Sequence, residues 1–235
     1  TAQEMGLQPT KLTEFGLVEI TVDGKIAHIL QSYSILNTQL STQLSRHKHL
    51  TRVLLERHNL PNIPHLRTTE RETVEVFLRE HKQIIAKPVM GSRSAGVVLI
   101  SKNRQLTGLS LEELIFEKYI EGREMRFVVL QHAVVSVLEK VYAEVINDPQ
   151  KVERISYPQE QWDHKLVKMA QQVAQVLGMG FAAVDFIVDE QGEVFVLEVN
   201  SAAALRHMQH PTSGPGIDIA RMFLEATVAE LRKKS

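Results

Sequence analysis

The sequence of 235 residues contains no cysteine, which excludes disulfides, thiolate metal sites and a thiol nucleophile. It also lacks an apolar run near the roughly 20 residues that span a bilayer, and no signal-peptide pattern is visible. An excess of one charge is missing too, because 27 basic residues face 28 acidic ones. This balance argues against a dedicated nucleic-acid-binding protein. We therefore expect a cytoplasmic protein with neither nucleic acid nor membrane as a partner.

Strand-like and helix-like segments are interspersed, and several strands are joined by turns too short for a parallel crossover. Strands are predicted at 17–22, 26–30, 83–89, 97–101, 114–120 and 125–138, followed by a hairpin over 181–200. Helices are predicted at 39–59, 69–81, 162–177 and 217–233, with Thr69 and Glu72 forming a capping box. The pattern predicts the α+β class, with antiparallel hairpins carrying the functional residues.

Three oxygen-bearing side chains interrupt the apolar strands of the hairpin over 181–200, namely Asp185, Glu198 and Asn200. Two carboxylates on a half-buried sheet face repel each other and are costly to desolvate unless a positive charge joins them. Ligands that offer only oxygen favour Mg²⁺ or Mn²⁺ over zinc. The sequence therefore predicts a divalent-metal site here. A surface hairpin with a few polar positions is the alternative.

The register of this hairpin decides which side chains meet. If Val188 pairs with Glu193, Asp185 lies opposite Val196 and diagonal to Glu198. Strand alternation then predicts that Val196 shares one face with the three oxygen ligands. The other face is expected to contain Val184, Phe186, Phe195, Leu197 and Val199.

A loop rich in small residues lies between the strands predicted at 83–89 and 97–101. Small residues let backbone N–H groups approach a phosphate closely, and serine hydroxyls add donors. A strand follows the loop, so it is neither a Walker loop nor a dinucleotide fingerprint. Lys87 precedes it inside an apolar strand, where a lysine needs an anionic partner such as a phosphate. An ordinary turn is the alternative, and Lys48 taken alone is typical of an exposed helix surface.

The segment 116–128 is predicted as a strand, a bend at Gly122 and a second strand. Backbone donors and acceptors exposed in such a bend can pair with adenine, and the carboxylate of Glu124 can accept both ribose hydroxyls. Alternation places Glu124, Arg126 and Val128 on one face. A polar hairpin edge is the alternative interpretation.

Taken in order, Lys48, Lys87, the glycine loop, the bend and the hairpin resemble the ATP-grasp superfamily over about residues 40–230. Within it the chain is similar to the ATP-grasp domains of cyanophycin synthetase and bifunctional glutathione synthetase, and to ribosomal-protein glutamate ligases. The resemblance implies an ATP-grasp fold, in which two α+β lobes with antiparallel sheets clasp the nucleotide. It implies a small lobe over 46–115 and a large lobe over 116–235, after a remnant of an upstream domain or linker over 1–45. The start Thr1-Ala2-Gln3 likewise suggests a missing upstream piece.

The resemblance also implies where ATP and two Mg²⁺ (or Mn²⁺) ions bind. The implied nucleotide contacts are Lys48 and Lys87 for the α- and β-phosphates, Gly91, Ser92, Ser94, Ala95 and Gly96 for the β- and γ-phosphates, Glu117, Lys118 and Ile120 for adenine, and Glu124 for the ribose. The implied metal ligands are Asp185, Glu198 and Asn200. The implied catalytic residues are Arg126 near the transferred phosphoryl group, Lys140 as a further basic residue and Arg206 for the substrate carboxylate, with a surface arginine as the alternative for the last.

The expected function is that of an ATP-dependent ligase that joins a small-molecule carboxylate to an amine. A kinase on the same scaffold and a non-catalytic nucleotide-binding module are the alternatives. Relatives often form dimers or tetramers, although no residue here marks an interface. The chain departs from many relatives because it lacks a Pro-Gly pair after Asn200 and has a short linker between Lys140 and Trp162. His207 and His210 are interpreted as substrate-contacting or surface residues.

Overall fold

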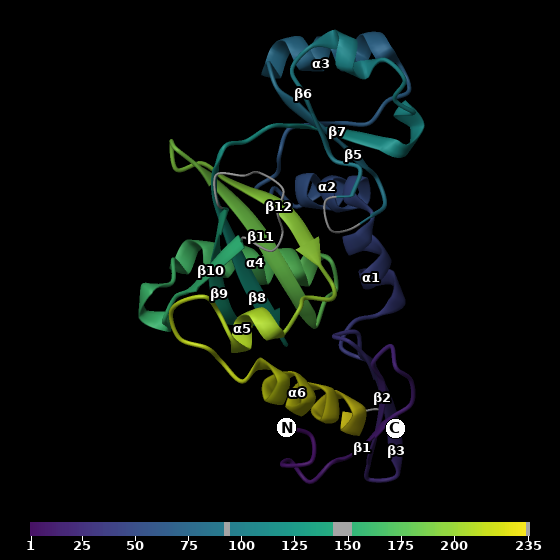
Figure 1. The fold of residues 1–235 in the computed structure, drawn as a ribbon, viewed down its shortest axis with the longest axis vertical. Helices are drawn as coiled ribbons and strands as arrows, with labels where there is room; N and C mark the ends of the chain where they lie inside the picture. The colour runs from purple at the N-terminus through teal and green to yellow at the C-terminus, as the bar shows by residue number, and fades with distance from the viewer. Residues whose placement is uncertain (92–94, 143–151, 234–235) are drawn as a thin grey trace.

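The computed structural model describes residues 1–91, 95–142 and 152–233. Three antiparallel sheets follow one another along the long axis of the molecule (Figure 1). A three-stranded sheet lies at one end, a five-stranded sheet in the middle and a four-stranded sheet at the other end. We call the five-stranded sheet with its helices the large lobe, and the four-stranded sheet with its helix the small lobe.

The N-terminal sheet is formed by β1 (Gln8–Lys11), β2 (Leu17–Val22) and β3 (Lys25–Leu30). Asp23 and Gly24 form the turn between β2 and β3, and both have the positive φ angles that a two-residue hairpin turn requires. The sheet packs against the C-terminal helix α6 (Ile219–Lys233) and shares one core with the large lobe. Its packing does not decide whether 1–45 derives from an upstream domain, which stays a prediction.

The five-stranded sheet of the large lobe has the order β10-β9-β8-β11-β12. Helix α4 (His164–Val176) covers one face, where its apolar residues pack on Phe127, Val184 and Phe186. The strands are β8 (Gly122–Leu130), β9 (Ala133–Tyr142), β10 (Val152–Ser156), β11 (Phe181–Asp189) and β12 (Val194–Asn200). The short helices around them are η4 (Gln159–Gln161) and α5 (Arg206–Gln209).

The single strand predicted over 125–138 is wrong, because the chain reverses in its middle. Gln131 and His132 have φ angles of 45° and 71°, so they form a tight turn between β8 and β9. Such left-handed positions usually carry glycine or asparagine, and neither is present to mark the turn.

The small lobe has the strand order β4-β7-β5-β6, and helix α3 (Arg71–His81) packs on one face. The strands are β4 (His65–Leu66), β5 (Ile84–Pro88), β6 (Val98–Ile100) and β7 (Leu114–Lys118), with the short helices η1 (Asn103–Leu106) and η2 (Leu111–Glu113) before β7. The capping box predicted at Thr69 and Glu72 is wrong. Helix α3 begins after Glu70, whose N–H donates to Thr68 Oγ1 at 3.0 Å.

The helix predicted over 39–59 is interrupted at His47. Helix α1 (Gln39–Arg46) ends there and α2 (Lys48–Arg57) begins, because His47 has an extended backbone. The His47 ring accepts a hydrogen bond from the N–H of Leu50 and so caps α2. The break matters for function because it brings the N–H of Lys48 to the carbonyl of Val89 at 2.9 Å.

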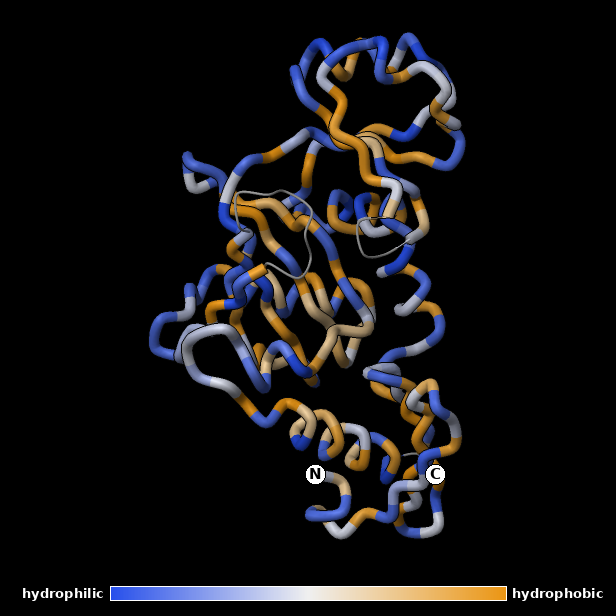
Figure 2. The backbone as a smooth tube through the Cα atoms, in the orientation of Figure 1, coloured by the Kyte–Doolittle hydropathy of each residue, from blue (hydrophilic) through white to orange (hydrophobic). Residues whose placement is uncertain are grey.

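Apolar residues concentrate in the strands and in the helix faces that cover them, while the outer helix surfaces are polar (Figure 2). The α+β class predicted from the sequence is confirmed by these mixed helices and antiparallel sheets. Among the described residues, no helix is both long and apolar enough to cross a membrane.

Candidate functional site

The hairpin β11–β12 contains a β-bulge that corrects the predicted register. Phe186 pairs with Val196 and Asp185 with Glu198, so Leu197 has no partner in the ladder. Asp185 therefore lies directly opposite Glu198 instead of opposite Val196. The bulge turns Leu197 and Glu198 toward the face of Asp185, while Val196 packs with the core under α4.

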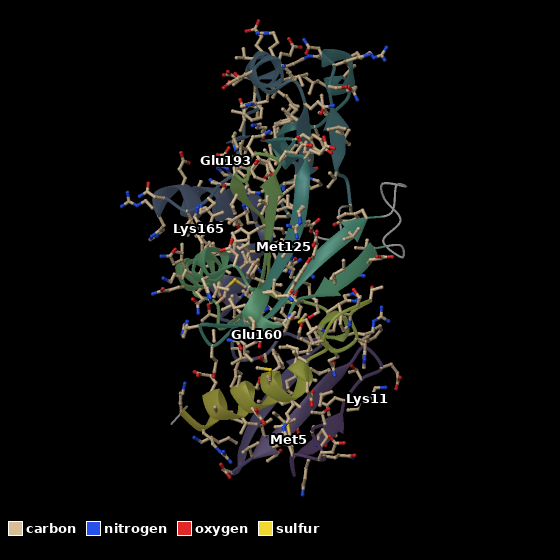
Figure 3. The ribbon with its side chains drawn as sticks, turned by 90° about the vertical axis from the view of Figure 1, so that its left-hand side faces the viewer. Met5, Lys11, Met125, Glu160, Lys165 and Glu193 are labelled. Atoms are coloured by element: carbon tan, nitrogen blue, oxygen red, sulfur yellow. The ribbon has the colours of Figure 1, made fainter. Side chains whose placement is uncertain are left out.

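The predicted faces of the hairpin are therefore only partly correct. Val184, Phe186 and Val199 lie in the core under α4, as predicted. Phe195 and Leu197 instead pack with Ile63 and Ile187 on the side of the predicted ligands. In the side view of Figure 3, the tip of the hairpin, marked by Glu193, lies at the small-lobe end of the large lobe. The hairpin thus presents its acidic face next to the junction of the lobes.

Asp185 is completely buried and held by two cations of the same sheet. Arg126, its partner on β8, donates from Nε and Nη2 to the two carboxylate oxygens at 2.7 Å each. Lys140 on β9 donates to Asp185 Oδ2 at 2.9 Å. Burial opposes ionisation, but Arg126 and Lys140 outweigh it and hold the Asp185 pKa at about 2. Burial likewise opposes the charge of Arg126, and Asp185 raises the arginine pKa above its ordinary value.

Glu124, the predicted ribose ligand, lies on the same face beside this group. Its two oxygens accept hydrogen bonds from Lys140 Nζ and from the Tyr142 hydroxyl. Burial and the charge of Glu124 raise the pKa of Tyr142, so the phenol stays protonated and donates. Lys140 thus bridges Glu124 and Asp185 and joins the predicted ribose and metal residues in one network.

Glu198 and Asn200 have side chains without a hydrogen-bond partner among the described residues, and both are half-buried. Burial lowers the pKa values of Lys48 and Lys87, and the negative charge of Glu198 opposes part of this effect, so Glu198 lies near both lysines. Within the described ranges, no three carboxylate, histidine or cysteine side chains converge. The third predicted ligand, Asn200, offers an amide oxygen instead. Two free oxygen donors next to a buried carboxylate fit a hard divalent cation.

Lys48 and the glycine loop meet at the start of α2. Lys48 Nζ donates to the carbonyl of Gly91 at 3.1 Å. Gly96 has a φ angle of +73°, and a Cβ there would lie 2.9 Å from Pro88, so only glycine fits. Ala95 is exposed in the same loop. The predicted phosphate contacts Ser92 and Ser94 lie outside the described residues.

Lys87 is buried and bonded to Glu117, which the sequence predicted near adenine. Lys87 Nζ lies 2.7 Å from Glu117 Oε2. Burial lowers the pKa of Lys87, and Glu117 only partly opposes this. The Glu117 side chain is 3% exposed, so its carboxylate faces the protein interior and holds the lysine. Its predicted contact with adenine stays a prediction.

Arg52 completes this group, and sequence reasoning missed it. Its guanidinium donates to both Glu117 oxygens, at 2.9 and 3.2 Å, and to the carbonyls of Val196 and Leu197 at the bulge. Arg52 thus ties the small-lobe strand β7 to the metal-side strand β12. Burial opposes the charge of Glu117, but Arg52 and Lys87 hold its pKa at about 2.

The hinge between the lobes follows β7. The N–H of Lys118 donates to the Pro64 carbonyl at 2.9 Å, so this donor is already used. Ile120 lies outside the strands, and no partner is found for its backbone N–H among the described residues. The Ile120 side chain packs with Phe195 and Leu197, which gives the hinge an apolar surface.

Arg206 begins helix α5 and has no side-chain partner among the described residues. It lies near Arg154, which sequence reasoning did not assign to the site, and near His207, which it interpreted as a substrate-contacting or surface residue. Burial, then Arg154 and Arg206, lower the His207 pKa to about 4. His207 is therefore neutral at pH 7 and surrounded by arginines.

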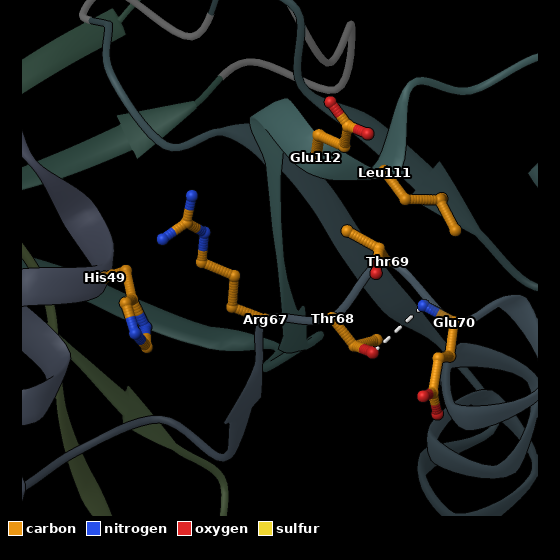
Figure 4. A pocket seen from close by; sticks show the side chains of 7 residues that line it. All are labelled: His49, Arg67, Thr68, Thr69, Glu70, Leu111 and Glu112. Atoms are coloured by element: carbon orange, nitrogen blue, oxygen red, sulfur yellow. Dashed lines mark hydrogen bonds between the residues drawn. The ribbon is translucent and has the colours of Figure 1, made fainter.

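A separate polar pocket lies beside the small lobe and contains none of the predicted site residues. Arg67 extends into it between His49 and Glu112 (Figure 4). The other lining residues are Thr68, Thr69, Glu70 and Leu111. Its lining residue His49 follows Lys48 on α2, while no described residue of the hairpin lines it.

Comparisons with known proteins match this arrangement to one family. A family model described as an ATP-grasp domain matches residues 46–203, more than half of the chain. The tetrahydromethanopterin:alpha-L-glutamate ligase of Methanocaldococcus jannaschii is 26% identical over 185 residues, covering 71% of this chain and 62% of that protein. The D-alanine–D-alanine ligase of Geobacter sulfurreducens is 25% identical over 198 residues, covering 76% and 63%.

Among solved structures, a bifunctional glutathione synthetase from Pasteurella multocida superposes with a TM-score of 0.75 at 12% identity. The superposition covers 97% of this chain and 43% of that one. At this identity the likeness shows the fold alone. The chain spans less than two thirds of the length of either curated relative.

Replacing Arg52 tests the link between the lobes. Arg52→Met leaves Glu117 with a single cation and the carbonyls at the bulge without their donor. Breaking a buried ion pair by removing one partner costs about 3–5 kcal/mol. We expect urea denaturation to show a loss of this size in the free energy of unfolding.

The matched control is Arg57→Met, because Arg57 is an exposed residue of the same helix. Its effect should stay within about 0.5 kcal/mol. Equal losses in the two variants would contradict the role given to Arg52.

The two buried carboxylates predict an acid dependence of stability. The pKa values of Glu117 and Asp185 are about 2 in the folded protein, below their ordinary values of 4.5 and 3.8. Their stabilisation is thus fully present above about pH 5 and is lost as the pH falls toward 2. Because the loss is complete only below pH 2, we expect the two groups together to lower the free energy of unfolding by about 3 kcal/mol between pH 7 and pH 3, measured by urea denaturation.

Glu14→Gln serves as the control, because the Lys11–Glu14 pair is exposed. Its loss should leave the fall in the free energy of unfolding at low pH unchanged. A free energy of unfolding that stays level down to pH 3 would refute the buried ion pairs.

Proposed function

The chain belongs to the ATP-grasp family, and we propose that it is an ATP-dependent carboxylate–amine ligase. It forms an amide bond through an acyl-phosphate intermediate, on amino acid or peptide substrates. The family match confirms the ATP-grasp fold that the sequence predicted. The names of the two curated relatives, both amide-forming ligases, support this activity.

One observation carries the proposal: Lys48 on α2 and Lys87 in the small lobe lie beside the acidic hairpin of the large lobe. The charge of Glu198 acts on both Lys48 and Lys87, although they come from different elements. Buried like charges and isolated carboxylates are both unfavourable, and a metal-bound triphosphate neutralises both. ATP phosphates are therefore the ligand that suits this junction best.

The nucleotide is placed by the same elements. Lys48 and Lys87 bind the α- and β-phosphates, and the loop from Gly91 to Gly96 covers the β- and γ-phosphates. The free N–H of Ile120 pairs with adenine, whose ring rests on the apolar surface of Ile120 and Leu197. Glu124 accepts the ribose hydroxyls, which requires it to share its oxygens with Lys140 and Tyr142.

Glu198 and Asn200, with Asp185 as the third donor, would hold divalent cations, two Mg²⁺ or Mn²⁺ ions in our proposal. When bound, such ions supply charge neutralisation of the phosphate oxygens. Asp185 already forms ion pairs with Arg126 and Lys140, so these two cations also orient its carboxylate.

The chemistry proceeds in two steps. A carboxylate oxygen of the substrate attacks the γ-phosphorus, the bond to the β-phosphate oxygen breaks, and ADP leaves. The amine then attacks the acyl carbon, the C–O bond to phosphate breaks, and the amine loses a proton. Lys87 and Arg126 stabilise charge on the transferred group, and closure of the glycine loop excludes water from the acyl phosphate.

Two alternatives use the same nucleotide site. A kinase would transfer the phosphoryl group to an alcohol and need no amine. A binding module would hold ATP without turnover. The complete set of Asp185, Glu198 and Asn200 supports a catalytic protein over the module. A cytoplasmic location and a homo-oligomeric state remain predictions.

ATP turnover by the full chain tests the proposal. With ATP, Mg²⁺ and a panel of amino acids and dipeptides, hydroxylamine should trap the acyl phosphate as a hydroxamate. Glu198→Gln removes the negative charge of one metal ligand and leaves a weaker amide donor, so hydroxamate and ADP formation should both fall at least about 100-fold.

Glu190→Gln is the control, because Glu190 lies exposed in the hairpin turn and should keep wild-type rates. ADP formation without a hydroxamate would favour the kinase. Unchanged turnover by Glu198→Gln would exclude the proposed site.

A further inference from the structure

Cross-strand pairing gathers basic side chains on the site face of the large lobe. Arg154 on β10 pairs with Lys140 on β9, which pairs with Glu124 on β8. Arg126 lies two residues after Glu124 and therefore on the same face. Antiparallel partners project from one face, so Arg154 extends the row of site residues beyond Lys140.

Helix α5 brings another arginine to this edge. The segment after α5 pairs with β10, because Arg154 donates its N–H to Thr212 Oγ1 at 3.0 Å and accepts from the Thr212 N–H at 2.8 Å. Helix α5, which begins at Arg206, lies in front of the five-stranded sheet (Figure 1). The pairing at Thr212 thereby holds the start of this helix near Arg154. Burial, then the charges of Arg126 and Arg206, lower the pKa of Arg154, as expected for crowded cations.

Two basic side chains at this edge, Arg154 and Arg206, have no carboxylate partner among the described residues. Arg126 and Lys140 pair with Asp185, and Lys140 also pairs with Glu124. Within the described residues, the Arg154 guanidinium bonds only to the Val152 carbonyl, and Arg206 has no side-chain partner. Arg154 is half-buried and Arg206 is exposed, so an anion can reach both, and the planar guanidinium suits a carboxylate.

We propose that Arg154 and Arg206 bind a second, non-reacting carboxylate, so that the acid activated by this enzyme is a dicarboxylate. The chemical class is an acidic amino acid or the acidic C-terminal residue of a peptide. The reacting carboxylate lies toward Arg126 and the triphosphate, and the second carboxylate lies against the two arginines. This inference rests on the proposed ligase function and deepens it.

The test compares acids that differ by one charge. Full-length wild-type protein is assayed for ATP-dependent hydroxamate formation with L-glutamate against L-glutamine, L-aspartate against L-asparagine, and Ala-Glu against Ala-Gln. We expect kcat/KM for at least one acid to exceed that of its amide at least about 10-fold. The free amino acids and the dipeptides identify which source of the dicarboxylate is used.

Variants of the two arginines then test whether these residues cause the preference for the acid over its amide. Arg154→Gln and Arg206→Gln should each raise the KM for the preferred acid at least about 10-fold, while the KM for ATP stays within about 2-fold. Selectivity between acid and amide should disappear. Arg221→Gln, on the exposed surface of α6, is the matched control and should keep it.

Binding separates this inference from the ligase proposal. Calorimetry with a non-hydrolysable ATP analogue and Mg²⁺ should detect the preferred acid in wild type and lose it in Arg154→Gln. Binding of a dicarboxylate without hydroxamate formation would support the arginine site and reject the ligase. Equal use or binding of acids and amides, or selectivity that survives both arginine variants, would overturn the inference.

Discussion

The buried group of Arg52, Glu117 and Lys87 is the interaction on which the rest of the site depends. Glu117 belongs to the small-lobe strand β7, and Arg52 reaches from α2 both to this carboxylate and to the bulged strand β12 of the large lobe. A lysine as buried as Lys87 keeps its charge only beside an anion, and Glu117 supplies it. The same arginine fixes the backbone from which Glu198 projects. Lys87 and Glu198, the proposed metal ligand, are thus positioned by the same buried group.

The β-bulge at Leu197 determines which side chains of β12 lie beside Asp185. In a regular strand, Glu198 and Phe195 would project from opposite faces. Only one of them could then lie on the face that contains Asp185 and Ile187. With it, apolar Phe195 and Leu197 lie beside acidic Glu198, which suits a nucleotide with an apolar ring at one end and charged phosphates at the other. Bulges are common next to active sites because they re-aim one side chain.

Much of the fold and the site follows from the sequence, and the failures have physical causes. Period-two and helical patterns located most strands and helices, and the residue types in the hairpin singled out Asp185, Glu198 and Asn200, which the structure brings to one face of the sheet and whose role as metal ligands stays a prediction. A bulge leaves no composition signal, so the register was wrong. The turn at Gln131 and His132 uses left-handed residues other than glycine. In the sequence Arg52 resembles an exposed helix residue, because its partner Glu117 lies far away along the chain. The only sign of its buried role is that it follows Lys48 by one helical turn, on the apolar side of α2.

Diffraction from crystals grown with Mn²⁺ and a non-hydrolysable ATP analogue tests the central claim most directly, because anomalous scattering locates the metal. The account predicts Mn²⁺ coordinated by Glu198 and Asn200, with the phosphates in contact with Lys48 and Lys87. Mn²⁺ away from these oxygens, or a nucleotide bound elsewhere, for example in the pocket around Arg67, would contradict it.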